Sequence, residues 1–308
     1  MTQQDSLSGL SDQIANAVEK AAHSLVTIAA RPRQSATGIL WKSESGELVV
    51  VTADHIVERE EDIKVTLPDH REVVAQLAGR DPGTDIAVLR LPGVTESADV
   101  APATTADGVR IGSLVLAAGR PTGDGPRVSF GAVSAIEGPR RTAGGGELER
   151  VIFADVVMYP GFSGGALIDL AGNVVGMVSS QLTRHSASAL PASTVQRVTQ
   201  TLLTHGRMRR GYLGVGTQQS PISPTLAQRA GLSQTTGLLV MTIEANSPAE
   251  QAGFLIGDII IGVDGQPATD VEGLRSALGS DKLGKAVTLR VLRGGEPKDV
   301  SVTVGERP

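Results

Sequence analysis

The chain has 308 residues, which at about 150 residues per domain predicts two domains. Hydrophobic residues make up 40% and charged residues 20%, an ordinary globular composition that excludes a wholly disordered or fibrous chain. The formal net charge of −5 provides no basic field for nucleic acid, and the absence of cysteine excludes disulfides, thiol catalysis and cysteine metal sites.

The first domain is predicted to begin with a short amphipathic helix and to consist mainly of strands. Within residues 11–22, Ile14 and Val18 lie four apart, as on one face of a helix, and the strand SLVTIAA begins at Ser24. Further apolar runs are separated by Gly, Asp, Ser or Pro, at 37–41, 47–52, 62–67, 72–79, 85–91, 113–119, 127–136, 150–155, 165–170 and 173–180. Such closely spaced strands without intervening helices predict an antiparallel barrel or sandwich.

A helix over 192–205 is predicted to close this domain. Its apolar residues share one face, Ser193 and Gln196 fit a capping box, and Gly206 is a stop signal. After the charged link 207–211, short strands and short helices predict a second domain. There Thr269 and Glu272 are expected to cap a helix, and KAVTLRVLRGG is expected to form a closing hairpin.

Ser163 lies in GFSGG (161–165), where glycines let the backbone turn sharply and present N–H groups to an oxyanion. The string also fits the G-x-S-x-G nucleophile elbow of α/β-hydrolases, which requires a strand before the serine and a helix after it. Here Tyr159 and Pro160 precede the serine and a strand pattern follows. The hydrolase order of serine, acid and histidine would leave only Asp169 as the acid, so the elbow is rejected.

The order histidine, aspartate, serine fits better. His55 lies just after a predicted strand, Asp85 begins another, and Ser163 follows later in the chain. Two rival acids are less suitable, because Asp81 precedes a proline and reads as a turn former, and Asp54 is the immediate neighbour of the histidine that it would have to orient. The remaining histidines are expected at the surface: His23, His70, His185 and His205.

Together these motifs resemble the HtrA family of trypsin-like serine proteases, which are chymotrypsin-fold enzymes followed by PDZ domains. The resemblance includes AVEKAAHSLVTI, TGILWKSESGELVVVTADHIV, RDPGTDIAVLRL and YPGFSGGALIDL, and then GYLGV and SPAEQAGFLIGDIIIGVDG. It implies a mainly β protein with a helical segment at 1–23, a chymotrypsin-like double antiparallel β-barrel at 24–206 and an α+β PDZ domain at 211–308.

By this resemblance Ser163 would be the nucleophile, His55 the general base and then acid, and Asp85 the group that orients the histidine. The backbone N–H groups of Gly161 and Ser163 would form the oxyanion hole. No metal or organic cofactor is expected. The family usually has Asn where this chain has Phe162. With this bulky ring beside the serine, an oxyanion hole that is misformed at rest is the alternative to a formed one.

The resemblance also implies two binding sites. The S1 pocket is expected at Val157, with the opposite wall in SASALP around Ser188, and its apolar floor favours cleavage after Val, Ala, Ile or Leu unless the nearby Asp155 reverses this. The PDZ groove is expected to capture the terminal carboxylate of an apolar peptide. Its predicted residues are Tyr212, Leu213, Gly214, Val215, Leu274 and Leu278.

The implied function is an ATP-independent serine endopeptidase that degrades unfolded or damaged proteins in quality control and stress response, with unfolded polypeptides and peptide C-termini as partners. The alternative is a catalytically silent PDZ scaffold or holdase chaperone. A homo-oligomer is a further expected partner, although no aromatic residue precedes Trp41 to build a family-like trimer.

The start of the chain bears on its location. MTQQDSLSGLSDQ lacks the cationic start and apolar stretch of an export signal, and no apolar run approaches the roughly 20 residues of a membrane span. The sequence as written predicts a cytoplasmic protein without a membrane span. The alternative is a periplasmic or cell-envelope protein whose export segment has been removed.

Overall fold

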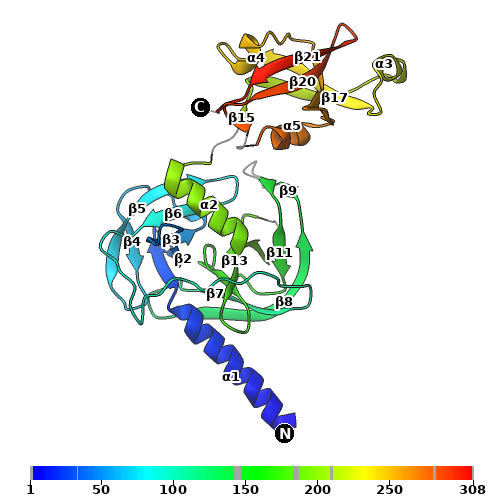
Figure 1. The fold of residues 1–308 in the computed structure, drawn as a ribbon. Coiled ribbons are helices and arrows are strands. Elements are labelled where there is room, and N and C mark those ends of the chain that lie inside the picture. The colour runs from blue at the N-terminus through cyan, green and yellow to red at the C-terminus, as the bar shows by residue number, and fades with distance from the viewer. Residues whose placement is uncertain are drawn as a thin grey trace. The chain divides into compact units, whose positions relative to one another are not determined.

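The computed structural model describes residues 3–32, 34–141, 147–182, 187–208, 211–279 and 282–306 (Figure 1). The chain divides into two units, Met1–Met208 and Arg209–Pro308. His185, expected at the surface, lies outside the described residues.

The first barrel is built from the first six strands. In hydrogen-bonded order these are β1, β2, β3, β6, β5 and β4, and β1 pairs with β4 to close the barrel. Their bounds are β1 Leu25–Ala29, β2 Ala36–Lys42, β3 Leu48–Thr52, β4 Ile63–Thr66, β5 Glu72–Asp81 and β6 Ile86–Arg90.

Strand β3 is buried on both faces because alternate residues enter different cores. Val50 packs into the interior of the first barrel, whereas Val49 and Val51 join a cluster that also contains residues of the second barrel. The side chains of a strand point alternately to opposite faces, so one apolar run can fill both cores. The end of β3 is thereby held at the junction of the two barrels.

The second barrel has the order β11, β14, β13, β12, β7 and β8, and β8 pairs with β11 to close it. Its strands are β7 Leu114–Gly119, β8 Arg127–Glu137, β11 Val151–Ala154, β12 Ala166–Ile168, β13 Val174–Ser179 and β14 Ala187–Pro191. The short strands β9 Arg140–Arg141 and β10 Glu147–Leu148 form a separate pair. The predicted double antiparallel barrel is confirmed.

Helix α2, Ala192–His205, packs on β5 and β6 of the first barrel and on β13 and β14 of the second (Figure 1). Gly206 ends it in the left-handed region and donates its N–H to the Leu202 carbonyl, as the stop signal predicted. The predicted capping box is wrong, because the N-cap is Pro191, without a side-chain cap. The side-chain oxygen of Gln196 instead accepts a hydrogen bond from Trp41 Nε1.

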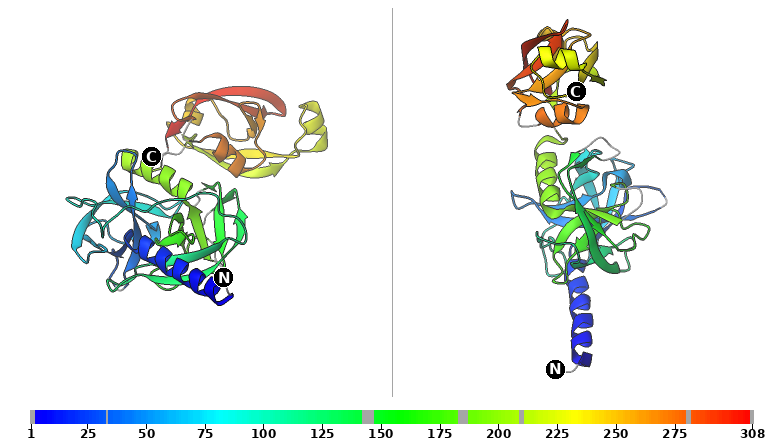
Figure 2. Two further views of the ribbon diagram at one scale, coloured as in Figure 1. Left: turned by 60° about the horizontal axis from the view of Figure 1, so that its bottom comes forward. Right: turned by 90° about the vertical axis from the view of Figure 1, so that its right-hand side faces the viewer.

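Helix α1 is longer than predicted and begins at Gln3 rather than at residue 11. Leu10 continues the spacing of Ile14 and Val18, so the apolar face extends toward the N-terminus. The C-terminal part of the helix packs on the inter-barrel cluster through Ala21, while its first turns extend beyond the barrels (Figure 2). No helix among the described residues is both long and apolar enough to cross a membrane.

The second unit has a sheet with the order β16, β17, β18, β20 and β21, with β19 paired to β18. The bounds of its strands are β15 Gly211–Tyr212, β16 Val215–Pro221, β17 Thr236–Ile243, β18 Ile259–Val263, β19 Gln266–Pro267, β20 Ala286–Arg293, β21 Glu296–Thr303 and β22 Gly305–Glu306. Its helices are α3 Pro224–Arg229, α4 Pro248–Gln251 and α5 Val271–Ala277. The closing hairpin is confirmed as β20 and β21.

The predicted Thr269 cap is wrong. Helix α5 is capped by Asp270, whose carboxylate accepts from the Gly273 N–H at 2.8 Å. Asp and Thr are both good N-cap residues, so the sequence around Thr269 offered two capping residues one position apart.

Candidate active site

His55 lies in a single 3₁₀ turn, Asp54–Ile56, directly after β3. Its Nδ1 lies 2.9 Å from both carboxylate oxygens of Asp85, and its backbone N–H donates to Asp85 Oδ1 at 3.0 Å. Because a carboxylate only accepts, Nδ1 carries the proton and Nε2 is left as an acceptor. The arrangement orients the imidazole and leaves Nε2 ready to take a proton.

Asp85 precedes β6 and has a φ of 59°, in the left-handed region that aspartate tolerates better than most residues. In this conformation its carbonyl accepts from the Asp54 N–H at 3.1 Å while its side chain faces His55. A third donor, the hydroxyl of Ser179 at the end of β13, also binds Asp85 Oδ2. The second barrel therefore supports the acid of the first barrel.

The two rival acids have other partners. Asp54 Oδ1 accepts from Arg80 Nε at 2.6 Å, and this hydrogen bond raises the pKa of the Arg80 guanidinium. Asp81 accepts from Gly83 N at 3.1 Å and Thr84 N at 3.0 Å, as a turn former does. Asp54 nevertheless matters to the site, because its ion pair holds the turn that carries His55.

Ser163 lies in a turn whose backbone fits against the first barrel. Gly164 has a φ of +84°, and a Cβ at this position would lie 2.2 Å from the Thr37 carbonyl oxygen and 2.9 Å from Ala53 N. Thr37 Oγ1 also donates to the Gly161 carbonyl at 2.7 Å. Because Ala53 immediately precedes the turn that carries His55, this close approach brings Ser163 to the same junction as His55.

The turn also presents backbone donors. Gly161, with a φ of +85°, and Ser163 are both buried. Within the described residues, no backbone carbonyl accepts a hydrogen bond from the N–H group of Gly161 or of Ser163. The N–H of Phe162, between them, donates to the Tyr159 carbonyl at 3.0 Å. The turn thus has two backbone N–H donors, two residues apart and one of them on Ser163 itself, that an oxyanion could accept from.

Phe162, which replaces the usual asparagine, points into the second barrel. It is fully buried among the apolar residues of that barrel, which include Val115 and Leu167. Its ring makes an edge-on contact with Tyr159 at a centroid distance of 5.3 Å. The ring therefore packs beneath the turn, in the apolar core of the second barrel.

The Ser163 hydroxyl has partners that the sequence did not indicate. Its Oγ lies 3.1 Å from Ser180 Oγ and accepts from the Ser180 N–H at 3.3 Å. Among the described residues, no hydrogen bond joins Ser163 Oγ to His55. Ser179 and Ser180, which contact Asp85 and Ser163, read in the sequence only as the polar end of an apolar strand.

The two residues predicted for S1 differ in exposure. Val157 follows β11 and is 55% exposed, with its carbonyl accepting from Ser129 Oγ at 2.8 Å. Ser188, in β14, is 2% exposed and donates to the Ser179 carbonyl at 3.3 Å. Asp155 is exposed. Of the predicted pair, only the Val157 side chain is exposed to solvent.

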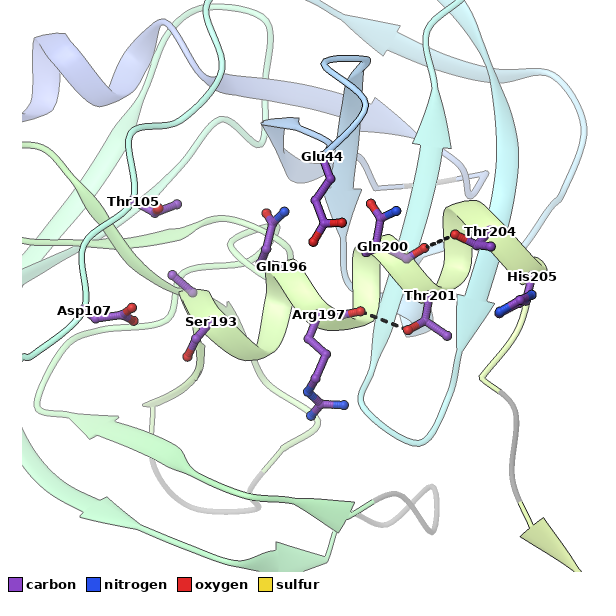
Figure 3. Close-up of a pocket in the computed structure, with 11 residues that line it drawn as sticks. Glu44, Thr105, Asp107, Ser193, Gln196, Arg197, Gln200, Thr201, Thr204 and His205 are labelled. Carbon is purple, nitrogen blue, oxygen red and sulfur yellow. Dashed lines mark hydrogen bonds between the residues drawn. The ribbon is translucent and has the colours of Figure 1, made fainter. Parts of the chain in front are cut away.

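A hollow of about 650 Å³ lies elsewhere, along the exposed face of α2 (Figure 3). Its polar lining includes Ser193 and His205, which lie near opposite ends of the helix and cannot act as a nucleophile and base together. In the described part of the chain, no three His, Asp or Glu side chains are grouped as metal ligands would be.

The second unit has a groove of about 360 Å³ between β16 and α5. All six residues predicted for peptide binding line it: Tyr212, Leu213, Gly214, Val215, Leu274 and Leu278. Strand β16 ends the sheet order, so its outer edge can accept another strand. Sequence reasoning missed Glu244, which also lines the groove and accepts from the Tyr212 hydroxyl at 2.5 Å.

Comparisons with known proteins agree with this architecture. A family model described as a trypsin-like peptidase domain matches residues 36–177, and one described as a PDZ domain matches residues 211–304. A probable periplasmic serine endoprotease DegP-like of Halomonas elongata is 36% identical over 274 residues, covering 86% of this chain and 55% of the relative. A protein of the same name in Rhizobium meliloti is 32% identical, covering 90% and 54%. The chain thus spans about half the length of these curated relatives.

Solved structures match over nearly the whole chain. The HtrA-type protease AlgW with a decapeptide is 30% identical with a TM-score of 0.76, covering 96% of this chain and 99% of that one. A serine endoprotease from Yersinia pestis is 26% identical with a TM-score of 0.75, covering 96% and 98%. With two closed barrels, a PDZ domain and these relatives, the chain belongs to the HtrA family of serine proteases.

Proposed function

We propose that this chain is a serine endopeptidase with Ser163 as nucleophile, His55 as base and Asp85 as the orienting acid. The observation that carries the proposal is the pair of 2.9 Å contacts from His55 Nδ1 to the Asp85 carboxylate, which leaves Nε2 as an acceptor beside the glycine-rich Ser163 turn.

The reaction follows from these groups. Ser163 Oγ attacks the scissile carbonyl carbon as His55 Nε2 takes its proton, and the N–H groups of Gly161 and Ser163 bind the oxyanion that forms. His55 then protonates the leaving amine, and a water molecule repeats the sequence on the acyl-enzyme. Asp85, held by Ser179, stabilises the imidazolium in both steps.

The proposed substrates are unfolded or damaged polypeptides, cleaved after small or branched apolar residues. The accessible apolar side chain of Val157 supports this preference, because burying an unpaired lysine or arginine beside it would cost several kcal/mol. The chemistry needs only water as a second reactant, so we propose that cleavage is independent of ATP. Quality control and stress response are the corresponding roles.

The PDZ groove is proposed to bind apolar peptide C-termini by strand addition to β16. The backbone at Leu213 and Gly214 would receive the carboxylate, with Leu274 and Leu278 contributing the apolar wall. The solved AlgW structures with a decapeptide and a tripeptide support a peptide ligand. Equal affinity for free-acid and amidated forms of one peptide would contradict carboxylate capture.

A periplasmic location is proposed over the cytoplasmic one that the sequence as written suggested. The support is that curated relatives are named periplasmic endoproteases.

Casein digestion by the wild type and by Ser163→Ala, without added nucleotide, tests the enzyme proposal. We expect cleavage by the wild type alone, and labelling of Ser163 by a fluorophosphonate probe with peptide mapping of the adduct. If the folded wild type cleaves no peptide at any temperature, the silent scaffold or holdase chaperone is the better assignment.

A further inference from the structure

The Ser163 hydroxyl is engaged by a residue that takes no part in the reaction described above. Ser180 contacts it twice, with Oγ at 3.1 Å and with its backbone N–H at 3.3 Å. The described residues show no hydrogen bond from Ser163 Oγ to His55. The proposed nucleophile is therefore hydrogen-bonded to Ser180 and not to the proposed base, His55.

The backbone keeps Ser180 in this place. The nucleophile turn pairs with the end of β13, because Gly164 N donates to the Val178 carbonyl at 2.9 Å and Val178 N donates to the Gly165 carbonyl at 2.8 Å. Ser179 is fixed between Asp85 Oδ2 and the Gln181 N–H. Ser180 is thereby held beside Ser163 with its own residue exposed to solvent.

The direction of the hydrogen bond determines its effect. A hydroxyl carries one proton and two lone pairs. Either hydroxyl can be the donor in the 3.1 Å contact between Ser163 Oγ and Ser180 Oγ. When Ser163 is the donor, its proton points at Ser180 Oγ and cannot be donated to His55 Nε2, while its oxygen still accepts from the Ser180 N–H.

We propose that Ser180 is a positioning residue that holds the Ser163 hydroxyl in a resting orientation away from His55. The proposal rests on the assignment of Ser163 as nucleophile. For attack to begin, the Ser163 hydroxyl must leave Ser180 and turn to His55. The usual net strength of a protein hydrogen bond sets this attenuation at about two- to tenfold.

The test is the rate of fluorophosphonate labelling at Ser163 in the full chain, together with kcat/KM for a small apolar ester. Ser180→Ala is expected to raise both by about two- to tenfold. Ser180→Thr keeps the hydroxyl and is expected to react at the wild-type rate. Ser180→Val has nearly the shape of threonine without the hydroxyl and is expected to react faster than Ser180→Thr.

Ser45→Ala is a matched control. Ser45 is an exposed serine whose hydroxyl lies 2.9 Å from that of Ser43, on the turn between β2 and β3. The substitution removes a similar contact between two serine hydroxyls outside the active site. It is expected to leave the labelling rate and kcat/KM unchanged. Melting temperatures of all variants show that each one is folded.

Unchanged or slower labelling of Ser163 in Ser180→Ala would overturn the inference, as would equal rates for Ser180→Thr and Ser180→Val. A purely supporting role for the hydroxyl would slow the reaction in both hydroxyl-free variants. Absence of any label on Ser163 in the wild type would overturn the proposed function and this inference with it. Label on Ser163 at one common rate would overturn the inference alone.

Discussion

In the first barrel the groups around His55 are charged or polar and are paired with one another, whereas in the second barrel the turn around Ser163 consists of glycines above an apolar ring. His55 is bound by Asp85, and its own turn is held by the ion pair of Asp54 with Arg80. Next to Ser163, the backbone of Gly164 approaches Thr37 and Ala53 too closely for a Cβ, and the Phe162 ring is buried in the barrel core.

The difference reflects what each residue must do. In the proposed mechanism the base has to be oriented and its positive charge stabilised, which requires directional hydrogen bonds and a carboxylate. The turn that carries the proposed nucleophile has to hold backbone N–H groups at fixed positions, which requires a defined turn shape and a rigid support. We therefore expect the loss of the polar partner of His55 to alter chemistry, and the loss of the apolar support beneath the Ser163 turn to alter stability.

Asp85→Asn is expected to have the largest effect on the first-barrel side. It should lower kcat by about 10⁴-fold, because an amide favours the wrong histidine tautomer, as in other serine triads. Asparagine tolerates a φ of 59° as aspartate does, so the protein should remain folded. Peptide hydrolysis and a melting curve check this, and an activity within tenfold of the wild type would contradict the assigned role.

Phe162→Ala tests the apolar support beneath the Ser163 turn in the second barrel. Removing this fully buried ring should lower the free energy of unfolding by about 3–5 kcal/mol through lost burial and a cavity. Phe130→Ala is the matched control, because Phe130 is 49% exposed on β8 and its loss should cost far less. Unfolding can be followed by fluorescence of Trp41, the only tryptophan. Equal losses in the two variants would show that Phe162 is not an anchor.

Arg80→Met tests the ion pair near His55 and should have the smallest of these effects. The Asp54 side chain is 8% exposed and would lose its partner, but the Arg80 side chain is 32% exposed, so the loss should be about 1–3 kcal/mol. The double variant Asp54→Asn with Arg80→Met should recover part of the stability lost in Arg80→Met.

Lys64→Met removes an exposed pair with Glu72 on the same barrel and serves as the control for this experiment. It should cost less than about 1 kcal/mol. If Arg80→Met lowered the free energy of unfolding no more than Lys64→Met does, the ion pair would have no role in holding the His55 turn.

Much of the fold was predictable because its signals are local. The strand runs at 47–52 and 72–79 became β3 and β5, and Gly206 ended α2, since strand alternation and a left-handed helix stop are both readable along the chain. The capping boxes were less predictable. Several residue types can cap a helix, and the choice at Gln196 was decided by Trp41, far away in the sequence.

The sequence by itself determined the two-domain, mainly β architecture and indicated His55, Asp85 and the GFSGG turn, because periodicity, glycine spacing and motif order are properties of neighbouring residues. Only the tertiary structure decided that Ser179 supports Asp85, that Arg80 binds Asp54 and that the Ser163 hydroxyl rests on Ser180. These contacts join residues from different strands or barrels. Their geometry depends on how the strands pack, and a side-chain hydroxyl leaves no pattern in the sequence that names its partner.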